Sequence, residues 1–335
     1  MRRYRLPGLL WVLPSSLVLV ILGGCASQRA RPVGTPVAAS TGPADVVVFA
    51  PHPDDESIAC AGVILTALAD GQRVRVVFLT NGDGYPTAAA ALRGKLEAQL
   101  SSEDFIELAR TRQREALAAA SVLGLRAVDL TFLGYPDAGL DKVYQNTEAT
   151  PYQQQFTRQS ETYGPARAEF SAEVYGAHAP YTRAAALANV AEILKRTRPQ
   201  AIYAASGVDT HPDHQATFWF VRDAVRETGY RGAFRTFLVH ASPLATYPCP
   251  AGCTPHLPLV PCAPFDGRAL LPGLPWPPAT RIALTPAQAE RKLRAVRAHR
   301  SQWQLEGEGT YLESFVKGEE VFWPIDTAAS ATAAE

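Results

Sequence analysis

The chain has 335 residues, of which 47% are hydrophobic and 19% are charged, so it can bury a substantial core. This composition excludes disordered, collagen-like and disulfide-knot proteins. The 32 Lys and Arg residues balance 32 Asp and Glu residues, which gives a formal net charge of +0. Because nucleic-acid-binding domains concentrate basic charge, we expect no nucleic-acid partner. The length is consistent with one large domain behind a removable leader.

Residues 1–25 have the pattern of a bacterial export signal. Three arginines precede an apolar run that ends at Leu22, and two glycines then lead into Cys25. This ending resembles a lipobox, the signal in which the cysteine is lipidated and becomes the mature N-terminus. An ordinary signal peptide or an uncleaved anchor is the alternative. We expect an exported protein, anchored to the cell envelope through lipidated Cys25, with residues 26–44 as a flexible tether.

After the tether, short apolar runs alternate with longer helical patterns. The runs are typical of buried parallel strands, and most of the helical patterns end at a glycine or before a proline. The expected strands are 46–50, 74–79, 128–133, 201–205 and 234–240. The expected helices are 57–70, 103–123, 183–198, 218–227 and 286–299. The alternation predicts one Rossmann-like α/β domain over 45–325, with a doubly wound, mostly parallel sheet and helices on both faces. Residues 326–335 are expected to form a disordered tail.

Two long segments lack clear periodicity. Residues 135–180 are rich in Gln, Tyr and Gly, and residues 242–280 are rich in proline. Loops of this length usually serve a function or move, so we expect both near the active site. The second loop carries Cys249, Cys253 and Cys262. An exported location is oxidising enough to join two of them, and the spacing leaves the pairing open.

Two short segments dense in His and Asp follow expected strands. They are residues 51–56 (PHPDDE) and residues 211–214 (HPDH). Open α/β sheets bind ligands at the carboxyl ends of their strands, where segments far apart in sequence can meet. His52, Asp55 and one imidazole of the second segment would form a face of two histidines and one carboxylate. Catalytic zinc and non-haem Fe²⁺ both use such a face.

Asp54 lies beside this expected metal face and favours hydrolysis. A structural metal site needs no further carboxylate, whereas hydrolysis needs a base for the attacking water. Each segment alone is also consistent with a turn in which Asp caps the next helix. The two segments together, each after a strand, favour a catalytic site.

The order of the motifs resembles the PIG-L (LmbE-like) family of metal-dependent N-deacetylases over about residues 45–323. The matching segments are 51–56, 79–84 (LTNGDG), 112–115 (RQRE), 123–124, 132–137 (FLGYPD), 209–214 (DTHPDH) and 292–302. The resemblance implies zinc-dependent hydrolysis of an N-acyl group, foremost N-acetyl, with a metal-bound water as the nucleophile. The implied substrate is an N-acetylglucosamine-like sugar or glycoconjugate.

The resemblance assigns the chemistry to five side chains. His52, Asp55 and His214 would bind Zn²⁺, with Fe²⁺ as the other candidate ion. Asp54 would be the general base and would later pass its proton to the departing amine. His211 would be protonated and would steady the oxyanion.

Five further residues are expected around them. Asp213 would orient the imidazole of His211, and Glu56 would lie behind the ligands. Arg112 and Asp137 match positions that face the sugar pocket. Asp209 is expected to contact substrate or to orient a histidine. Some family members have a tyrosine near the position of Asp209, so such a tyrosine would here come from elsewhere in the chain.

Three other functions remain consistent with parts of this pattern. A non-catalytic metal- or sugar-binding lipoprotein would not need Asp54 and His211, and both are present. An amidase acting on a non-sugar amide would use the same chemistry. An Fe²⁺ oxygenase could use the same ligand face, although the resemblance weighs against it. Because an exported enzyme would not meet small cytosolic conjugates, we expect an envelope or exogenous glycan, a glycolipid or a related amide as the substrate.

Overall fold

The computed structural model describes residues 42–241, 246–262 and 273–327. The expected signal at 1–25, nearly all of the expected tether, most of the expected tail and parts of the loop at 242–280 lie outside the described residues. Within the described ranges, no helix combines the length and the apolar character needed to cross a bilayer.

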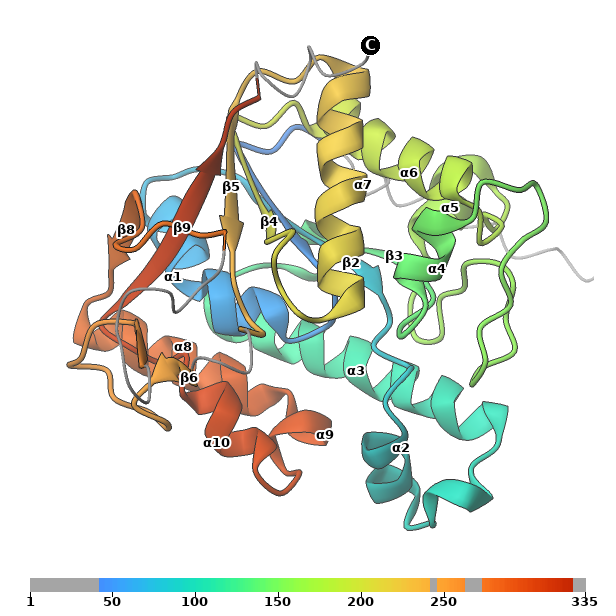
Figure 1. Ribbon diagram of the computed structural model, residues 1–335, viewed down its shortest axis with the longest axis horizontal. Coiled ribbons are helices and arrows are strands. Elements are labelled where there is room, and N and C mark those ends of the chain that lie inside the picture. Colours follow the sequence, from blue (N-terminus) through green and yellow to red (C-terminus); the bar gives the residue numbers. More distant parts are fainter. Residues whose placement is uncertain (1–41, 242–245, 263–272, 328–335) are drawn as a thin grey trace, which may run out of the picture. The chain divides into compact units, whose positions relative to one another are not determined.

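Seven strands form the central sheet. They are β1 (Val46–Ala50), β2 (Val74–Thr80), β3 (Leu130–Tyr135), β4 (Ala201–Ala205), β5 (Ala233–Phe237), β8 (Thr280–Ala283) and β9 (Glu319–Ile325). Their order is β3-β2-β1-β4-β5-β9-β8 (Figure 1). β1 to β5 pair in parallel, and β9 and β8 add antiparallel pairs at one edge. The predicted doubly wound, mostly parallel sheet is confirmed, and its order reverses between β1 and β4.

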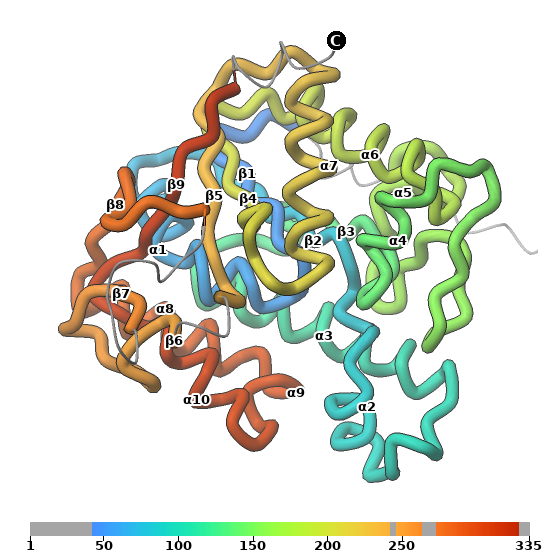
Figure 2. The backbone as a smooth tube through the Cα atoms, viewed as in Figure 1, coloured from blue at the N-terminus to red at the C-terminus, as the bar shows by residue number. Residues whose placement is uncertain are grey.

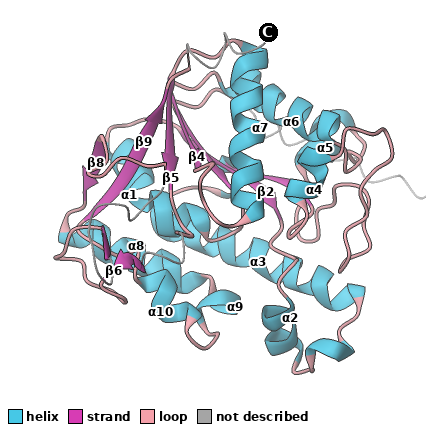
Figure 3. Ribbon diagram, in the orientation of Figure 1, coloured by secondary structure: helices cyan, strands magenta, loops and turns pink. Residues whose placement is uncertain are grey.

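Helices cover both faces of the sheet because the central strands are apolar on both sides (Figure 3). The large helices are α1 (Asp55–Ala69), α3 (Ser102–Leu123), α6 (Arg183–Thr197), α7 (Pro212–Thr228) and α8 (Pro286–Ala298). Val46 and Val48 of β1 share one core cluster with α1, α3 and α8. Val47 and Phe49 share the other with α6 and α7. The alternation along one strand therefore divides the core into two layers.

The sequence patterns missed the shorter elements. These are α2 (Pro86–Arg93), α4 (Leu140–Gln145), α5 (Phe170–Tyr175), β6 (Thr246–Cys249), β7 (Val260–Cys262), α9 (Arg300–Trp303) and α10 (Glu308–Glu313). One boundary matters for function: α7 begins at Pro212, earlier than the expected helix at 218–227. Its first turn is polar and so lacks apolar periodicity, but Pro at the first helical position and a capping His211 start the helix there.

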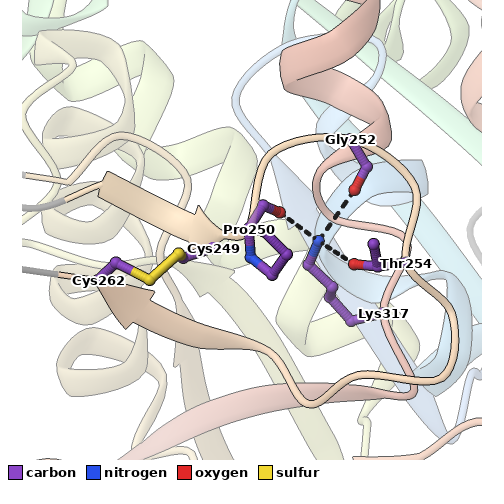
Figure 4. Close-up of a disulfide and its surroundings, with 6 residues drawn as sticks. All are labelled: Cys249, Pro250, Gly252, Thr254, Cys262 and Lys317. Atoms are coloured by element: carbon purple, nitrogen blue, oxygen red, sulfur yellow. Dashed lines mark hydrogen bonds between the residues drawn. A yellow bond between two sulfur atoms is a disulfide. The ribbon is translucent and has the colours of Figure 1, made fainter.

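The proline-rich segment contains the expected disulfide. Cys249 and Cys262 are joined across the β6–β7 pair (Figure 4). Cys253 remains a free, half-buried thiol. The structure thus resolves the pairing that the spacing left open.

A buried lysine in the segment that precedes β9 forms hydrogen bonds with the same loop. Lys317 Nζ donates hydrogen bonds to the carbonyl oxygens of Pro250 (2.6 Å) and Gly252 (3.0 Å) and to Thr254 Oγ1 (2.7 Å) (Figure 4). These bonds satisfy all three donors of the ammonium group. The loop is therefore tied to the sheet on the side where α10 lies.

A buried ion pair joins α1, α8 and β9. Lys292 Nζ of α8 lies 2.7 Å from Glu320 Oε1 of β9, and their side chains are 0% and 1% exposed. Glu320 also accepts hydrogen bonds from the backbone N–H groups of Gly62 (2.8 Å) and Val63 (3.1 Å) in α1. Removing one partner would leave the other charge buried and unpaired.

We expect Lys292→Met to lower the free energy of unfolding by about 3–5 kcal/mol, because breaking a buried pair has an effect of that size. Urea denaturation followed by circular dichroism measures this change. The control is Lys195→Met, whose exposed partner Glu227 lies 3.6 Å away and whose removal should change stability by less than about 1 kcal/mol. Equal losses in the two variants would show that the buried pair contributes no special stability.

Candidate active site

The two His- and Asp-rich segments meet at the carboxyl ends of the parallel strands. The β1–α1 turn and the start of α1 supply His52, Asp54 and Asp55, and the N-cap and first turn of α7, which follows β4, supply the second segment. β1 and β4 are neighbours in the sheet (Figure 2), so the rings of His52 and His214 come within 5.2 Å of each other. The site therefore lies at the switch point of the sheet, where such folds bind ligands.

His52, Asp55 and His214 direct one donor atom each toward a common point. Asp55 Oδ2 lies 3.4 Å from His52 Nδ1 and 3.4 Å from His214 Nε2. Tetrahedral ligands about 2.0–2.1 Å from Zn²⁺ are separated by about 3.3 Å, so these distances fit the ion. His214 Nε2 is buried and has no hydrogen-bond partner among the described residues. A buried nitrogen without a partner, beside a carboxylate and a second imidazole, fits a Zn²⁺ or Fe²⁺ ligand.

Carboxylates hold the outer nitrogen of each imidazole. His52 Nε2 lies 3.1 Å from Asp137 Oδ1 and 3.3 Å from Asp213 Oδ2, and His214 Nδ1 lies 3.1 Å from Asp209 Oδ2. Such partners fix the ring orientation and leave the inner nitrogen for a metal. Burial disfavours the charged form of His214, but neighbouring carboxylates outweigh it and raise the pKa of His214 to about 10. The same negative charge favours a bound cation.

Two other groups of residues also bring three donor atoms together. They are His52, His211 and Asp213, and Asp209, His214 and His240. In the first group, both oxygens of Asp213 already accept backbone hydrogen bonds. In the second, Asp209 accepts three backbone hydrogen bonds besides its contact with His214. In the group of His52, Asp55 and His214, Asp55 Oδ2 accepts a backbone hydrogen bond from His52 (2.9 Å), and His214 Nε2 has no hydrogen-bond partner among the described residues.

Asp213 is placed differently from the expectation. Its carboxylate contacts His52 and accepts hydrogen bonds from the backbone N–H groups of Ala138 (2.7 Å) and Leu140 (2.9 Å). Only its backbone N–H reaches His211, donating to Nδ1 at 3.2 Å. Asp213 therefore positions His52 and the chain before α4 with its side chain, and His211 with its main chain.

His211 is consequently held as a neutral imidazole. Because Nδ1 accepts the backbone hydrogen bond, the proton of the neutral ring sits on Nε2. Burial, followed by the charges of His52 and His214, lowers the pKa of His211 to about 3. The sequence-based expectation was a protonated ring. The neutral ring still has one N–H to donate toward the pocket that it lines.

Asp54 faces the pocket outside the ligand group and is paired with Arg112. Arg112 Nη2 lies 2.8 Å from Asp54 Oδ2, and the guanidinium also donates to the carbonyl oxygens of Pro53 and Gly82, each at 3.1 Å. Burial raises the pKa of Asp54 to about 6 against the opposing charge of Arg112. Gly82 has φ +68°, and a Cβ there would lie 2.5 Å from the guanidinium. Arg112 was expected to face the sugar pocket. It does line the pocket, but its guanidinium is paired with Asp54, the expected general base.

Glu56, expected behind the ligands, contacts Ser57 and His299. Its Oε1 accepts a hydrogen bond from Ser57 Oγ (2.7 Å) and lies 3.1 Å from His299 Nε2 at the start of α9. This contact fixes the terminal helices against α1, next to the pocket.

A cavity of about 280 Å³ opens over the metal face. Five of its lining residues with polar side chains have no role predicted from the sequence, and these are Tyr85, His240, Gln302, Glu308 and Tyr311. They come from the approach to α2, the end of β5 and the helices α9 and α10 (Figure 1). Gln302 ends a segment that resembles the family, whereas no local pattern marked the other four.

Comparison with known proteins identifies the family. The family described as PIG-L: GlcNAc-PI de-N-acetylase matches residues 47–225, which is more than half of the chain and includes both His- and Asp-rich segments. No curated protein gives a significant match.

Several solved structures are similar at low identity. N,N'-diacetylchitobiose deacetylase from Pyrococcus horikoshii is 19% identical, with a TM-score of 0.49 over 85% of each chain. A conserved protein from Thermus thermophilus is 20% identical, with a TM-score of 0.46 over 85% of this chain and 95% of that one. GalB from Pseudomonas putida, a 4-carboxy-2-hydroxymuconate hydratase, is 15% identical, with a TM-score of 0.46 over 84% and 95%. Structural similarity at this identity does not assign a reaction. The family match covers more than half of the chain, and the chain therefore belongs to the PIG-L family.

Proposed function

We propose that the protein is a zinc-dependent N-deacetylase that releases acetate from an N-acetylglucosamine-like sugar or glycoconjugate. One observation carries the proposal: Asp54, a carboxylate outside the ligand group, lines the same pocket as His52 and Asp55, whose donor atoms converge with that of His214. A site that only bound metal would not need this additional carboxylate.

The side chains around the pocket can supply each part of amide hydrolysis. When bound, Zn²⁺ acts as a Lewis acid toward the carbonyl and makes water more acidic. Asp54 accepts the proton of the attacking water and returns it to the nitrogen of the departing amine. Arg112 holds Asp54 in place, and the Nε2–H of His211 donates a hydrogen bond to the developing oxyanion.

We propose export and lipid anchoring through Cys25 as the setting of this reaction. The leader pattern supports it. The disulfide between Cys249 and Cys262 adds independent support, because such bonds persist in oxidising compartments.

The test is amine release by the purified protein from N-acetylglucosamine, its methyl glycoside and an N-acetylated amino acid. We expect turnover of the two sugars. Turnover of the amino acid alone would overturn the sugar assignment and favour an amidase. No release from any of the three by protein that carries one equivalent of metal would favour a non-catalytic binding protein.

A further inference from the structure

The pocket over the metal face adjoins a second cavity. The second cavity has a volume of about 670 Å³, and it shares the lining residues His240, Glu308 and Tyr311 with the first. We call the two cavities together the trough. The first cavity alone lies at the lower end of the usual range for small-ligand sites, about 300–1,000 Å³. A substrate longer than one sugar would therefore extend from the first cavity into the second.

The junction of the two cavities is a fixed surface. The hydroxyl of Tyr311 donates a hydrogen bond to the carbonyl oxygen of Val239 (2.8 Å), and its ring lies 6.1 Å from the ring of His240. Glu308 Oε1 accepts a hydrogen bond from the hydroxyl of Tyr85 (3.2 Å), a contact between the α2 approach and α10. Sugars commonly bind where an aromatic ring and a carboxylate adjoin, because they present both C–H faces and hydroxyl donors.

The trough is acidic away from the metal face. Among its described lining residues, Arg112 is the only lysine or arginine, and its guanidinium is engaged with Asp54. The second cavity is lined by Glu306 and Glu308 and, within the described part of the chain, by no lysine or arginine. A metal ion would offset the carboxylates at its own end of the trough. The carboxyl group of Glu308 lies at the junction, next to any unit that follows the reacting sugar.

We propose that the trough accepts an N-acetylated amino sugar extended by a neutral or amino-bearing sugar, and that Glu308 selects against extension by an anionic group. The inference rests on the proposed deacetylase function and specifies its substrates. A phosphate or carboxylate on the second unit would lie beside Glu308, and the described residues that line this cavity include no lysine or arginine to pair with it. The partial burial of Glu308 strengthens that repulsion. An ammonium or hydroxyl group there is attracted to the same carboxylate.

The experiment uses the full chain and three disaccharides in which N-acetylglucosamine is linked to glucosamine, N-acetylglucosamine or glucuronic acid. The measurement is kcat/KM for acetate release. We expect the anionic disaccharide to be used at least about tenfold less well than the neutral one, a difference of about 1.4 kcal/mol. Glu308→Gln should reduce the ratio of kcat/KM for the neutral disaccharide to that for the anionic one, mainly through KM, and Glu308→Lys should reverse the preference. Glu308→Asp, which keeps a carboxylate, should retain the wild-type preference.

The control is Glu227→Gln, at the opposite end of α7 from the pocket, which should keep the wild-type ratio. Circular dichroism checks that each variant is folded. Equal use of the three disaccharides, or an unchanged ratio in Glu308→Gln, would overturn the inference even while N-acetylglucosamine is deacetylated. A complete absence of acetate release from every sugar would instead overturn the proposed function.

Discussion

Asp54→Asn should lower kcat by at least about 10²-fold while the protein still carries one equivalent of metal. The substitution preserves the shape of the side chain but removes its capacity to accept a proton. Asp54 lies outside the group formed by His52, Asp55 and His214, so that group should hold its ion without the Asp54 carboxylate. Amine release gives the rate, and elemental analysis gives the metal content of the same sample.

The matched control is Asp129→Asn, which alters a carboxylate paired with Arg126 at 2.8 Å, outside the residues that line the pocket. It should leave both rate and metal content unchanged. If Asp54→Asn kept the wild-type rate, Asp54 would not be the base. If its metal content fell with its rate, Asp54 would belong among the ligands.

Much of this site could be predicted because it depends on the order of elements along the chain. Strands β1 to β5 are mostly apolar, and helices lie between them along the chain, so the parallel sheet and its switch point follow from periodicity. The segment that contains His52 comes directly after β1, and the segment that contains His214 comes shortly after β4. This order predicts that both segments lie at the carboxyl edge of the sheet. β8 follows the proline-rich segment, and β9 pairs antiparallel with both of its neighbours, so reasoning from parallel crossovers missed them.

Side-chain partners could not be predicted in the same way. Whether the carboxylate of Asp213 meets His211 or His52 depends on where the chain from Ala138 to Leu140 passes, and that segment has no periodic pattern. His240 illustrates a second limit: it lies alone in the sequence, yet the end of β5 brings its Nδ1 within 3.3 Å of Asp209. Packing between distant segments, rather than local pattern, decides such contacts.

Asp209→Asn should weaken metal binding by about 10–100-fold without removing a ligand, because residues behind the ligands have effects of this size. Asp209 contacts His214 Nδ1 and accepts hydrogen bonds from the backbone N–H groups of His211 (2.9 Å), Val239 (3.0 Å) and His240 (3.0 Å). The neutral amide would hold the ring of His214 less firmly and would remove negative charge near the ion. Competition with a chromophoric chelator measures the affinity directly, without relying on activity.

Replacing single histidines discriminates among the three groups of donors that the structure brings together. His214→Ala should abolish metal binding and turnover, whereas His211→Ala should retain the ion and lower kcat, because His211 donates to substrate rather than to metal in our proposal. His240→Ala should also retain the ion. Loss of metal in His211→Ala would favour the group of His52, His211 and Asp213, and loss in His240→Ala would favour the group that contains Asp209. The unpartnered Nε2 of His214, which faces Asp55 Oδ2 at 3.4 Å, is the reason to expect the first pattern.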